Sequence, residues 1–226
     1  FFIMIRRPTR STLDRSSAAS DVNKRQSIES SVDADIVSPI PDSGLPAALG
    51  YSSQAKIEFD MGIIRNHYVG RTFIEPTQQI RQLGVKLKHN PNRQIIKNKK
   101  IILVDDSIVR GTTSKKIVDM LYHAGAKEIH MRISSPPIKY PDFYGIDTPN
   151  KEDLIAHNFS IKEIGNKIGV NSLAYLSIEG LYKALGFNKR DDKNPQLTDH
   201  CFTGDYPIKP TAVSYTHLPL PTSDLE

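Results

Sequence analysis

Two adjacent carboxylates are followed by hydroxyl-bearing and small residues in the segment 105–113, which reads DDSIVRGTT. Asp105 and Asp106 can accept hydrogen bonds from a vicinal diol or face a divalent cation. Hydroxyl groups and the backbone N–H groups around Gly111 suit a phosphate, above all where a helix begins. An acidic pair alone usually ends a strand and caps a turn, but the whole run indicates a site for a phosphorylated ribose. A nucleotide P-loop is excluded because its Gly-x-x-x-x-Gly-Lys-[Ser/Thr] pattern is absent.

The residues around this run predict the elements that position it. The segment 99–104, with its apolar run Ile101 to Val104, is typical of a strand buried on both faces. Ile117, Val118 and Leu121 share one face of a helix that follows the run, and Gly125 stands where such a helix ends. A second strand is expected over 129–133, where apolar and polar residues alternate.

The segment before the run continues the same alternation of elements. We expect a short strand at 34–37, a turn-rich loop at 39–44, a helix from Pro46 and a strand over 56–64. Strand–helix–strand repeats predict an α/β fold, a mostly parallel sheet with helices on both faces. Ligands of such folds lie at the carboxyl ends of the strands, where Asp105 and Asp106 stand.

Composition limits the function classes without choosing among them. The 226 residues carry a net charge of +5, which fits nucleic acid, an anionic membrane surface, a phosphate-rich small molecule or only a slightly basic surface. The apolar runs are too short for a membrane-spanning helix. One cysteine, Cys201, excludes an internal disulfide framework and a multi-cysteine zinc site. Because no secretion signal opens the sequence, a cytoplasmic location is expected.

The two ends of the chain differ from its middle. Residues 1–31 are rich in Ser and Arg and show no sustained period, so we expect an irregular N-terminal stretch. Residues 32–186 form the predicted domain, and 187–211 a polar C-terminal extension without regular structure. Residues 212–226 look like a translated cloning adaptor and are set aside.

The segment 102–114, ILVDDSIVRGTTS, resembles the signature with which type I phosphoribosyltransferases bind phosphoribosyl pyrophosphate (PRPP). Flanking segments, from about Asp33 to about Tyr206, resemble the amidophosphoribosyltransferase family; they are PIPDSG (39–44), YVGRTFI (68–74), SSPP (134–137) and FYGID (143–147). The resemblance implies a type I phosphoribosyltransferase fold. It also implies displacement of pyrophosphate from PRPP by ammonia, normally supplied by glutamine. The product would be 5-phosphoribosylamine, in the first step of purine biosynthesis.

The resemblance also assigns roles to residues. Asp105 and Asp106 would bind the ribose hydroxyls beside Mg²⁺, with Ser43 as a further metal position. The PRPP-binding residues would continue with Ser107, Ile108, Val109, Arg110, Gly111, Thr112 and Thr113, which hold the 5′-phosphate. A loop over 65–90 would close over PRPP, with Lys88, Arg71 and Tyr68 acting in catalysis and with Arg65, Asn66, His67, Gly70 and Thr72 in the lid. The alternative for this segment is a solvated basic surface loop, which its local chemistry favours less. Arg65 and His67 stand where the family usually has Lys and Arg, so the donors at that corner are altered but still basic.

Departures from the family shape the remaining expectations. Family members begin with a glutamine-hydrolysing domain whose N-terminal residue is cysteine, whereas residue 1 here is Phe. We therefore expect the transferase half, missing its glutaminase partner and dependent on ammonia. Some members hold an iron–sulfur cluster through cysteines; Asp142 and Thr198 stand at two of those positions, so no cluster is expected. Cys201 is then interpreted as a structural thiol, and His123, His130 and His157 as surface or packing residues. The resemblance further implies a homo-oligomer, with no nucleic-acid or membrane partner.

Two alternatives from other classes remain open. A PRPP-sensing regulator would use the same fold but bind nucleic acid, a reading weakly favoured by the basic residues of the N-terminal stretch. A salvage phosphoribosyltransferase would join a free nucleobase to PRPP. Its lid would be shorter and a hood would bind the base, which the matches at 68–74 and 143–147 disfavour.

Overall fold

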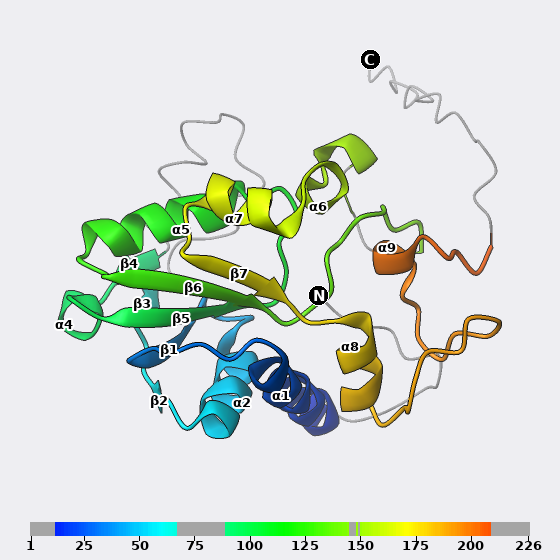
Figure 1. The fold of residues 1–226 in the computed structure, drawn as a ribbon, viewed down its shortest axis with the longest axis horizontal. Helices are drawn as coiled ribbons and strands as arrows, with labels where there is room; N and C mark the ends of the chain where they lie inside the picture. The colour runs from blue at the N-terminus through cyan, green and yellow to red at the C-terminus, as the bar shows by residue number, and fades with distance from the viewer. Residues whose placement is uncertain (1–11, 67–88, 145–147, 149, 209–226) are drawn as a thin grey trace, which may run out of the picture.

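A five-stranded parallel sheet forms the centre of the molecule, with strand order β2-β1-β5-β6-β7 (Figure 1). The computed structural model describes residues 12–66, 89–144, 148 and 150–208, with side chains from residue 21 onward. The strands of the sheet are β1 (Ile36–Pro39), β2 (Glu58–Phe59), β5 (Lys100–Asp105), β6 (Glu128–Ile133) and β7 (Ser172–Tyr175). A separate antiparallel pair consists of β3 (Ile63–Arg65) and β4 (His89–Pro91).

Helices cover both faces of the sheet, as the sequence predicts (Figure 1). One face carries α1 (Thr12–Glu29) and α2 (Leu45–Ala55), and the other carries α5 (Thr112–His123) and α7 (Ile161–Ile168). The remaining helices are α4 (Arg93–Ile96), the 3-10 turn η2 (Lys151–Asp153), α6 (Ile155–Asn158), α8 (Ile178–Ala184) and α9 (His200–Thr203). No helix among these residues is both long and apolar enough to cross a membrane.

The central strand β5 is buried on both faces. Ile101 and Leu103 pack into the cluster on the α5 side, whereas Ile102 and Val104 pack with α2. Side chains of a strand alternate between the two faces of a sheet, so a continuous apolar run is what a strand covered on both sides requires. The prediction for this strand is confirmed.

The polar residues that alternate along β6 are also buried. His130 and Arg132 are 7% and 3% exposed. The guanidinium of Arg132 donates to the carbonyls of Ser30 and Met131 and to the hydroxyl of Ser172 at 2.9–3.1 Å. Burial lowers the pKa of Arg132. The second face of β6 is therefore a polar interior that lies beneath the end of α1.

The expectation of an irregular N-terminal stretch is wrong for residues 12–29, which form α1. The helix buries a mainly polar face, with Asn23, Gln26 and Ser27 at most 4% exposed. The amide of Gln26 donates to the carbonyl of Ile133 at 2.6 Å. Tertiary contacts, rather than an apolar stripe, stabilise this helix, so hydrophobic periodicity gave no signal for it.

Helix α1 is fastened at its end to α8. The Glu29 carboxylate accepts hydrogen bonds from the backbone N–H and the hydroxyl of Ser177 at 3.1 and 3.0 Å. Ser177 is itself the N-cap of α8. A Cβ atom at Gly180 would lie 2.3 Å from a Glu29 carboxylate oxygen, so glycine permits this close approach.

Two further sequence expectations need correction. The predicted strand 56–64 is two strands, because β2 pairs with β1 whereas β3 pairs with β4. Between them the Gly62 N–H turns to the hydroxyl of Ser38 at 3.0 Å. The segment 187–208, expected to be a polar extension without regular structure, contains α9 and buries Cys201 and Phe202 in a cluster with Leu181 of α8.

Candidate functional site

The carboxyl ends of two neighbouring strands meet where the acidic pair lies. Strand β5 ends at Asp105, and β1, which pairs with it along its length, ends at Pro39. The loop after β1 folds against β5, because the Ile40 N–H donates to the Val104 carbonyl at 2.8 Å. This arrangement places the exposed Ser43, on the loop that leads into α2, at the same edge of the sheet as the two carboxylates.

Local hydrogen bonds orient the two carboxylates. The Asp106 N–H donates to Oδ1 of Asp105 at 2.9 Å, and the Ser107 hydroxyl donates to Oδ1 of Asp106 at 3.3 Å. The Asp105 carbonyl accepts from both the N–H and the hydroxyl of Ser134 on the neighbouring strand end. Burial, and then the charge of Asp106, raise the pKa of the Asp105 carboxyl well above its usual value. Cationic or hydrogen-donating ligands would relieve this unfavourable pairing.

The loop after the carboxylates is anchored on both sides. Ile108 is 1% exposed in the main core, and the Val109 carbonyl accepts from the Ile155 N–H at 2.9 Å. Arg110 is exposed and forms a 3.1 Å ion pair with Asp153. These contacts hold the loop between β5 and α5 against the core and against the segment 153–155.

The N-terminus of α5 is open to an anion. Its N-cap is Gly111, which has a φ of 75° and provides no side-chain cap. Thr112 and Thr113 are exposed in the first turn, which lacks acidic residues. The unpaired N–H groups and the dipole at such a terminus attract phosphate.

The β3–β4 pair forms the base of the predicted lid. Arg65 at the end of β3 lies opposite His89 in β4, so this pair joins the two ends of the segment 66–88. The Arg65 guanidinium contacts the carboxylate of Asp42, in the loop after β1. Asn66 is half-buried. The other predicted catalytic and lid residues lie outside the described residues; they are His67, Tyr68, Gly70, Arg71, Thr72 and Lys88.

Comparison with known proteins identifies the family to which this domain belongs. The family model of the phosphoribosyl transferase domain matches residues 16–134, which include most of α1, β5 and the loop to α5. The chain belongs to the phosphoribosyl transferase domain family. This match begins within the stretch that the sequence predicts to be irregular.

Relatives of this phosphoribosyltransferase chain are named amidophosphoribosyltransferase. The Rhizobium etli protein is 60% identical over 182 residues, which are 80% of this chain and 37% of that protein. The Bacillus subtilis protein is 49% identical over 193 residues, 85% of this chain and 40% of that one. The solved glutamine PRPP amidotransferase of B. subtilis, complexed with ADP and GMP, has a TM-score of 0.75, with 85% of this chain and 42% of that one covered. The phosphoribosyltransferase chain thus spans about two-fifths of the length of these relatives.

A glycine at the site gives a first prediction for this phosphoribosyltransferase. A Cβ atom at Gly44 would lie 2.4 Å from the Val104 carbonyl oxygen and 2.8 Å from that of Ile40. Because both atoms belong to the backbone, Gly44→Ala is expected to move the loop that carries Ser43 and to cost about 1–3 kcal/mol of stability. The measurement is urea unfolding, paired with PRPP affinity.

Gly169→Ala is the matched control. Gly169 has a φ of 88° but nothing within 4 Å of a built Cβ, so alanine there meets only backbone strain. It is expected to cost about 1 kcal/mol and to leave PRPP affinity unchanged. Equal PRPP affinity in the two variants would show that the loop after β1 takes no part in the site of this phosphoribosyltransferase.

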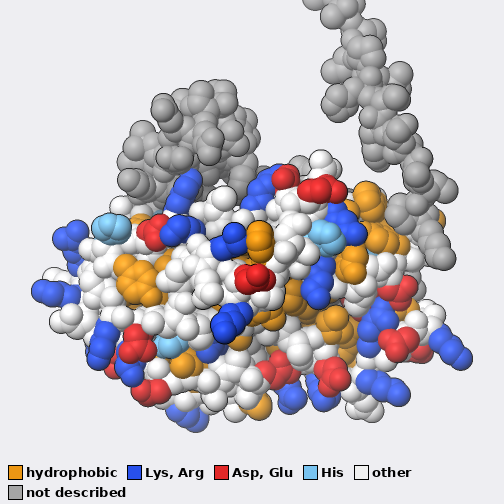
Figure 2. Space-filling view, turned by 45° about the horizontal axis from the view of Figure 1, so that its top comes forward, with side chains coloured by type: hydrophobic (Ala, Val, Ile, Leu, Met, Phe, Trp, Pro, Cys, Tyr) orange, Lys and Arg blue, Asp and Glu red, His pale blue; other side chains and the backbone are white. Residues whose placement is uncertain are grey.

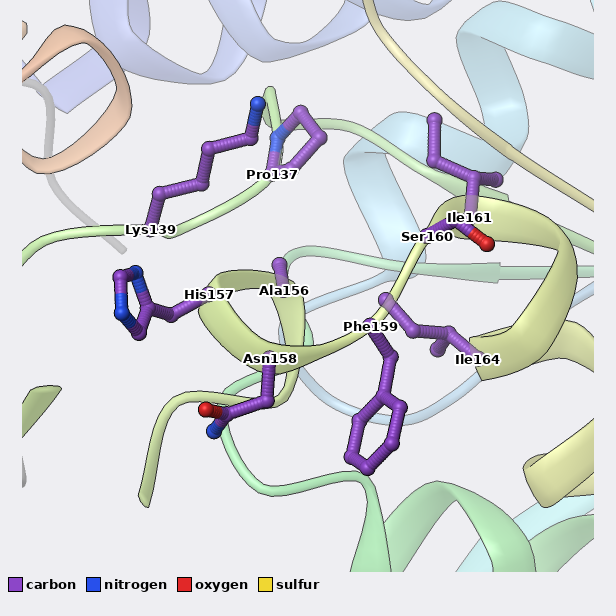
Figure 3. A pocket seen from close by; sticks show the side chains of 9 residues that line it. All are labelled: Pro137, Lys139, Ala156, His157, Asn158, Phe159, Ser160, Ile161 and Ile164. Atoms are coloured by element: carbon purple, nitrogen blue, oxygen red, sulfur yellow. The ribbon is translucent and has the colours of Figure 1, made fainter. Parts of the chain in front are cut away.

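A cavity of about 320 Å³ lies beside α6 (Figure 3). Pro137 and Lys139 line it from the segment after β6, and His157 and Phe159 line it from α6 and its end. None of the predicted PRPP residues borders this cavity. The cavity and the predicted PRPP site are therefore lined by different residues.

Sequence reasoning missed one cluster of chemically active side chains in this phosphoribosyltransferase. Asp142, His200 and Cys201 place an oxygen, a nitrogen and a sulfur atom within 4.8 Å of one another. Burial, and next the Asp142 carboxylate, raise the pKa of the Cys201 thiol to about 12. The carboxylate and the other two residues are 58 and 59 positions apart in sequence, and their spacing follows no metal-binding pattern. Only the fold brings them together.

Proposed function

We propose that this chain is the phosphoribosyl-transferring part of an amidophosphoribosyltransferase. In this proposal it displaces pyrophosphate from PRPP with ammonia, normally supplied by glutamine, to give 5-phosphoribosylamine in the first step of purine biosynthesis. One observation carries the proposal: the carboxylates of Asp105 and Asp106 end β5, and the fixed loop after them leads to the uncapped N-terminus of α5. A diol-binding pair next to a phosphate-binding terminus matches the two ends of a phosphorylated ribose.

Each group in this site receives a role from its chemistry. Asp105 and Asp106 accept hydrogen bonds from the ribose 2′- and 3′-hydroxyls, and the 5′-phosphate lies on the N–H groups at the start of α5. The hydroxyls that surround this phosphate are those of Ser107, Thr112 and Thr113. Ile108, Val109 and Arg110 contribute backbone and hold the loop, since Ile108 is buried and Arg110 is ion-paired.

The donor set also fits Mg²⁺, which prefers oxygen ligands and keeps several waters. Asp105 and Asp106 would hold it, with the Ser43 hydroxyl at the adjoining strand end, and the desolvated Asp105 carboxyl favours a positive partner. When bound, Mg²⁺ supplies stabilisation of the charge that develops on pyrophosphate.

The reaction requires no covalent nucleophile from the protein. The bond between C1 and the pyrophosphate oxygen breaks, ammonia forms the new C1–N bond from the opposite face, and the added nitrogen loses a proton. Lys88, Arg71 and Tyr68 are proposed to face the leaving pyrophosphate, and the lid residues from Arg65 to Thr72 to exclude water. The contact between Arg65 and Asp42 supports this role, because it fixes the base of the segment beside the strand ends.

The proposal includes partners beyond this chain. A glutamine-hydrolysing domain would supply ammonia, and a homo-oligomer would be the working form. The share of the relatives that this chain spans, 37–42%, supports the first of these. On the face shown in Figure 2, Lys and Arg are interleaved with Asp and Glu, which offers no support for a nucleic-acid partner. The cytoplasmic location stays a prediction.

The test is pyrophosphate release from PRPP with a panel of acceptors: ammonium at alkaline pH, glutamine, adenine, guanine and orotate. We expect release that requires both ammonium and Mg²⁺, with glutamine inactive for this chain alone. Reactions without PRPP or with a chelator provide the blanks. Release driven only by a nucleobase would identify a salvage enzyme instead. Tight PRPP binding without release, together with steeply salt-dependent DNA binding, would identify a regulator.

A further inference from the structure

Three buried side chains of different chemistry converge in a cluster that shares no residue with the strand-end site. Asp142 lies in the segment after β6, and His200 and Cys201 begin α9. Nε2 of His200 lies 2.7 Å from Oδ2 of Asp142, and the Cys201 sulfur lies 3.5 Å from the same oxygen. The side chains of His200 and Asp142 are 3% and 6% exposed. The cluster is therefore enclosed within the protein.

Surrounding contacts hold this cluster in place. Oδ1 of Asp142 accepts from the Tyr144 N–H at 2.7 Å, which leaves Oδ2 directed to His200 and Cys201. The Cys201 carbonyl accepts from the N–H groups of Lys139 and Tyr140, so the backbones of the two segments are joined as well. Hydrogen bonds of this kind orient the side chains that bind a ligand.

One ring nitrogen of His200 has no hydrogen-bond partner among the described residues. This atom, Nδ1, is buried. The ring is enclosed by Tyr144 and Tyr206, whose centroids lie 5.1 and 5.2 Å from it. A buried nitrogen without a partner costs free energy. Nδ1 is distinct from Nε2, the ring nitrogen that faces Asp142 and is available to a metal ion.

We propose that Asp142, His200 and Cys201 bind one Zn²⁺ ion, with a fourth position for water. Imidazole nitrogen, thiolate sulfur and carboxylate oxygen are the ligand atoms that zinc takes in proteins, whereas Mg²⁺ prefers oxygen alone. Binding displaces the thiol proton, and His200 coordinates as the neutral imidazole. The ion would fasten α9 to the segment after β6. The proposal does not rest on the phosphoribosyl-transfer reaction.

The distances permit tetrahedral coordination with a small adjustment. Zinc bond lengths of 2.0–2.3 Å imply about 3.6 Å between a sulfur and an oxygen ligand, close to the 3.5 Å observed. They imply about 3.3 Å between a nitrogen and an oxygen ligand, so the His200–Asp142 pair must open from its 2.7 Å hydrogen bond.

The experiment uses Co²⁺ as a spectroscopic substitute for Zn²⁺ on the full chain after treatment with a chelator. We expect one equivalent of Co²⁺ to bind, with a thiolate-to-cobalt charge-transfer band and the intense visible bands of tetrahedral cobalt, both removed by Zn²⁺. Zn²⁺ should also raise the melting temperature. The assay is repeated in an Asp105→Asn, Asp106→Asn background, which removes the carboxylates of the strand-end site.

Variants assign the ligands. Cys201→Ser should abolish the charge-transfer band, and Cys201→Ser or His200→Gln should weaken Co²⁺ binding at least about 100-fold. His157→Gln, an exposed histidine outside the cluster, should bind as the unchanged chain does. Circular dichroism confirms folding, and if His200→Gln does not fold, the small change Cys201→Ser decides. A folded, unchanged chain that shows no thiolate band with excess Co²⁺ would overturn the proposal and leave a hydrogen-bonded Asp–His–Cys cluster.

Discussion

The Asp105→Asn, Asp106→Asn double variant is expected to release pyrophosphate from PRPP at least about 100-fold more slowly than the unchanged chain, a loss of about 2.7 kcal/mol in transition-state stabilisation. Asparagine keeps the size of each side chain and one acceptor oxygen, so the difference lies in charge. Two amides neither attract a divalent cation nor accept strongly from the ribose hydroxyls. Pyrophosphate release is measured with ammonium and Mg²⁺ at saturating PRPP.

Asp119→Asn provides the matched control for this prediction. Asp119 lies on α5 and is about half exposed. Among the described residues, its one ion pair is with Lys115, at 3.1 Å. Its replacement removes one charge near the site and is expected to leave the rate within about twofold, since exposed pairs contribute little. A double variant that keeps a rate close to that of the control would place the transfer site elsewhere.

Arg190→Ala is expected to have the largest effect on stability, about 3–5 kcal/mol of the free energy of unfolding. The guanidinium holds Asp199 through bonds of 2.6 and 3.1 Å, and the Asp199 side chain is 2% exposed. Its remaining ion-pair partners are Asp192 and Asp205. Hydrogen bonding to Asp199 raises the pKa of Arg190, which keeps the guanidinium charged. Without it, Asp199 would be a buried carboxylate held only by neutral groups such as the Tyr182 hydroxyl.

Urea unfolding measures this loss against Lys183→Ala. Lys183 pairs with Glu179 at 3.7 Å on α8, and both side chains are well exposed, so its removal should cost at most about 1 kcal/mol. Arg190→Lys should fall between the two, because lysine restores the charge but not the two-pronged geometry. Should Arg190→Ala cost no more than Lys183→Ala, the buried pair would contribute nothing beyond a surface contact.

The elements next to the site follow from the sequence because they are local and apolar. The uninterrupted apolar run of β5 predicts a buried strand, and the single apolar face of α5 predicts a helix. Both elements pack into the main hydrophobic cluster. The residues of the segment 105–113 are contiguous and directly follow β5. The sequence therefore predicts both their ligand chemistry and their position at the end of the strand. Ser43 joins it only through strand pairing, and its role in binding metal stays a prediction.

What the sequence misses depends on polar contacts between distant segments. Helix α1 buries Gln26 against the carbonyl of Ile133, 107 positions away, and no apolar period marks that face. The cluster of Asp142 and His200 is equally distant in sequence and equally polar. Hydrophobic patterns in a sequence predict which apolar residues are buried. They do not predict which polar groups form buried hydrogen bonds with distant residues.

The hydrogen bond between Glu29 and Ser177 joins two residues that are 148 positions apart in sequence. The carboxylate of one helix end serves as an extra cap for the N-terminus of another, a favourable position for a negative charge. Fraying of α1 would therefore remove this second cap, although the Ser177 hydroxyl would still accept from the Gly180 N–H. It would also open to water the polar interior beneath β6. We therefore expect α1 and α8 to unfold together, although they lie near opposite ends of the chain.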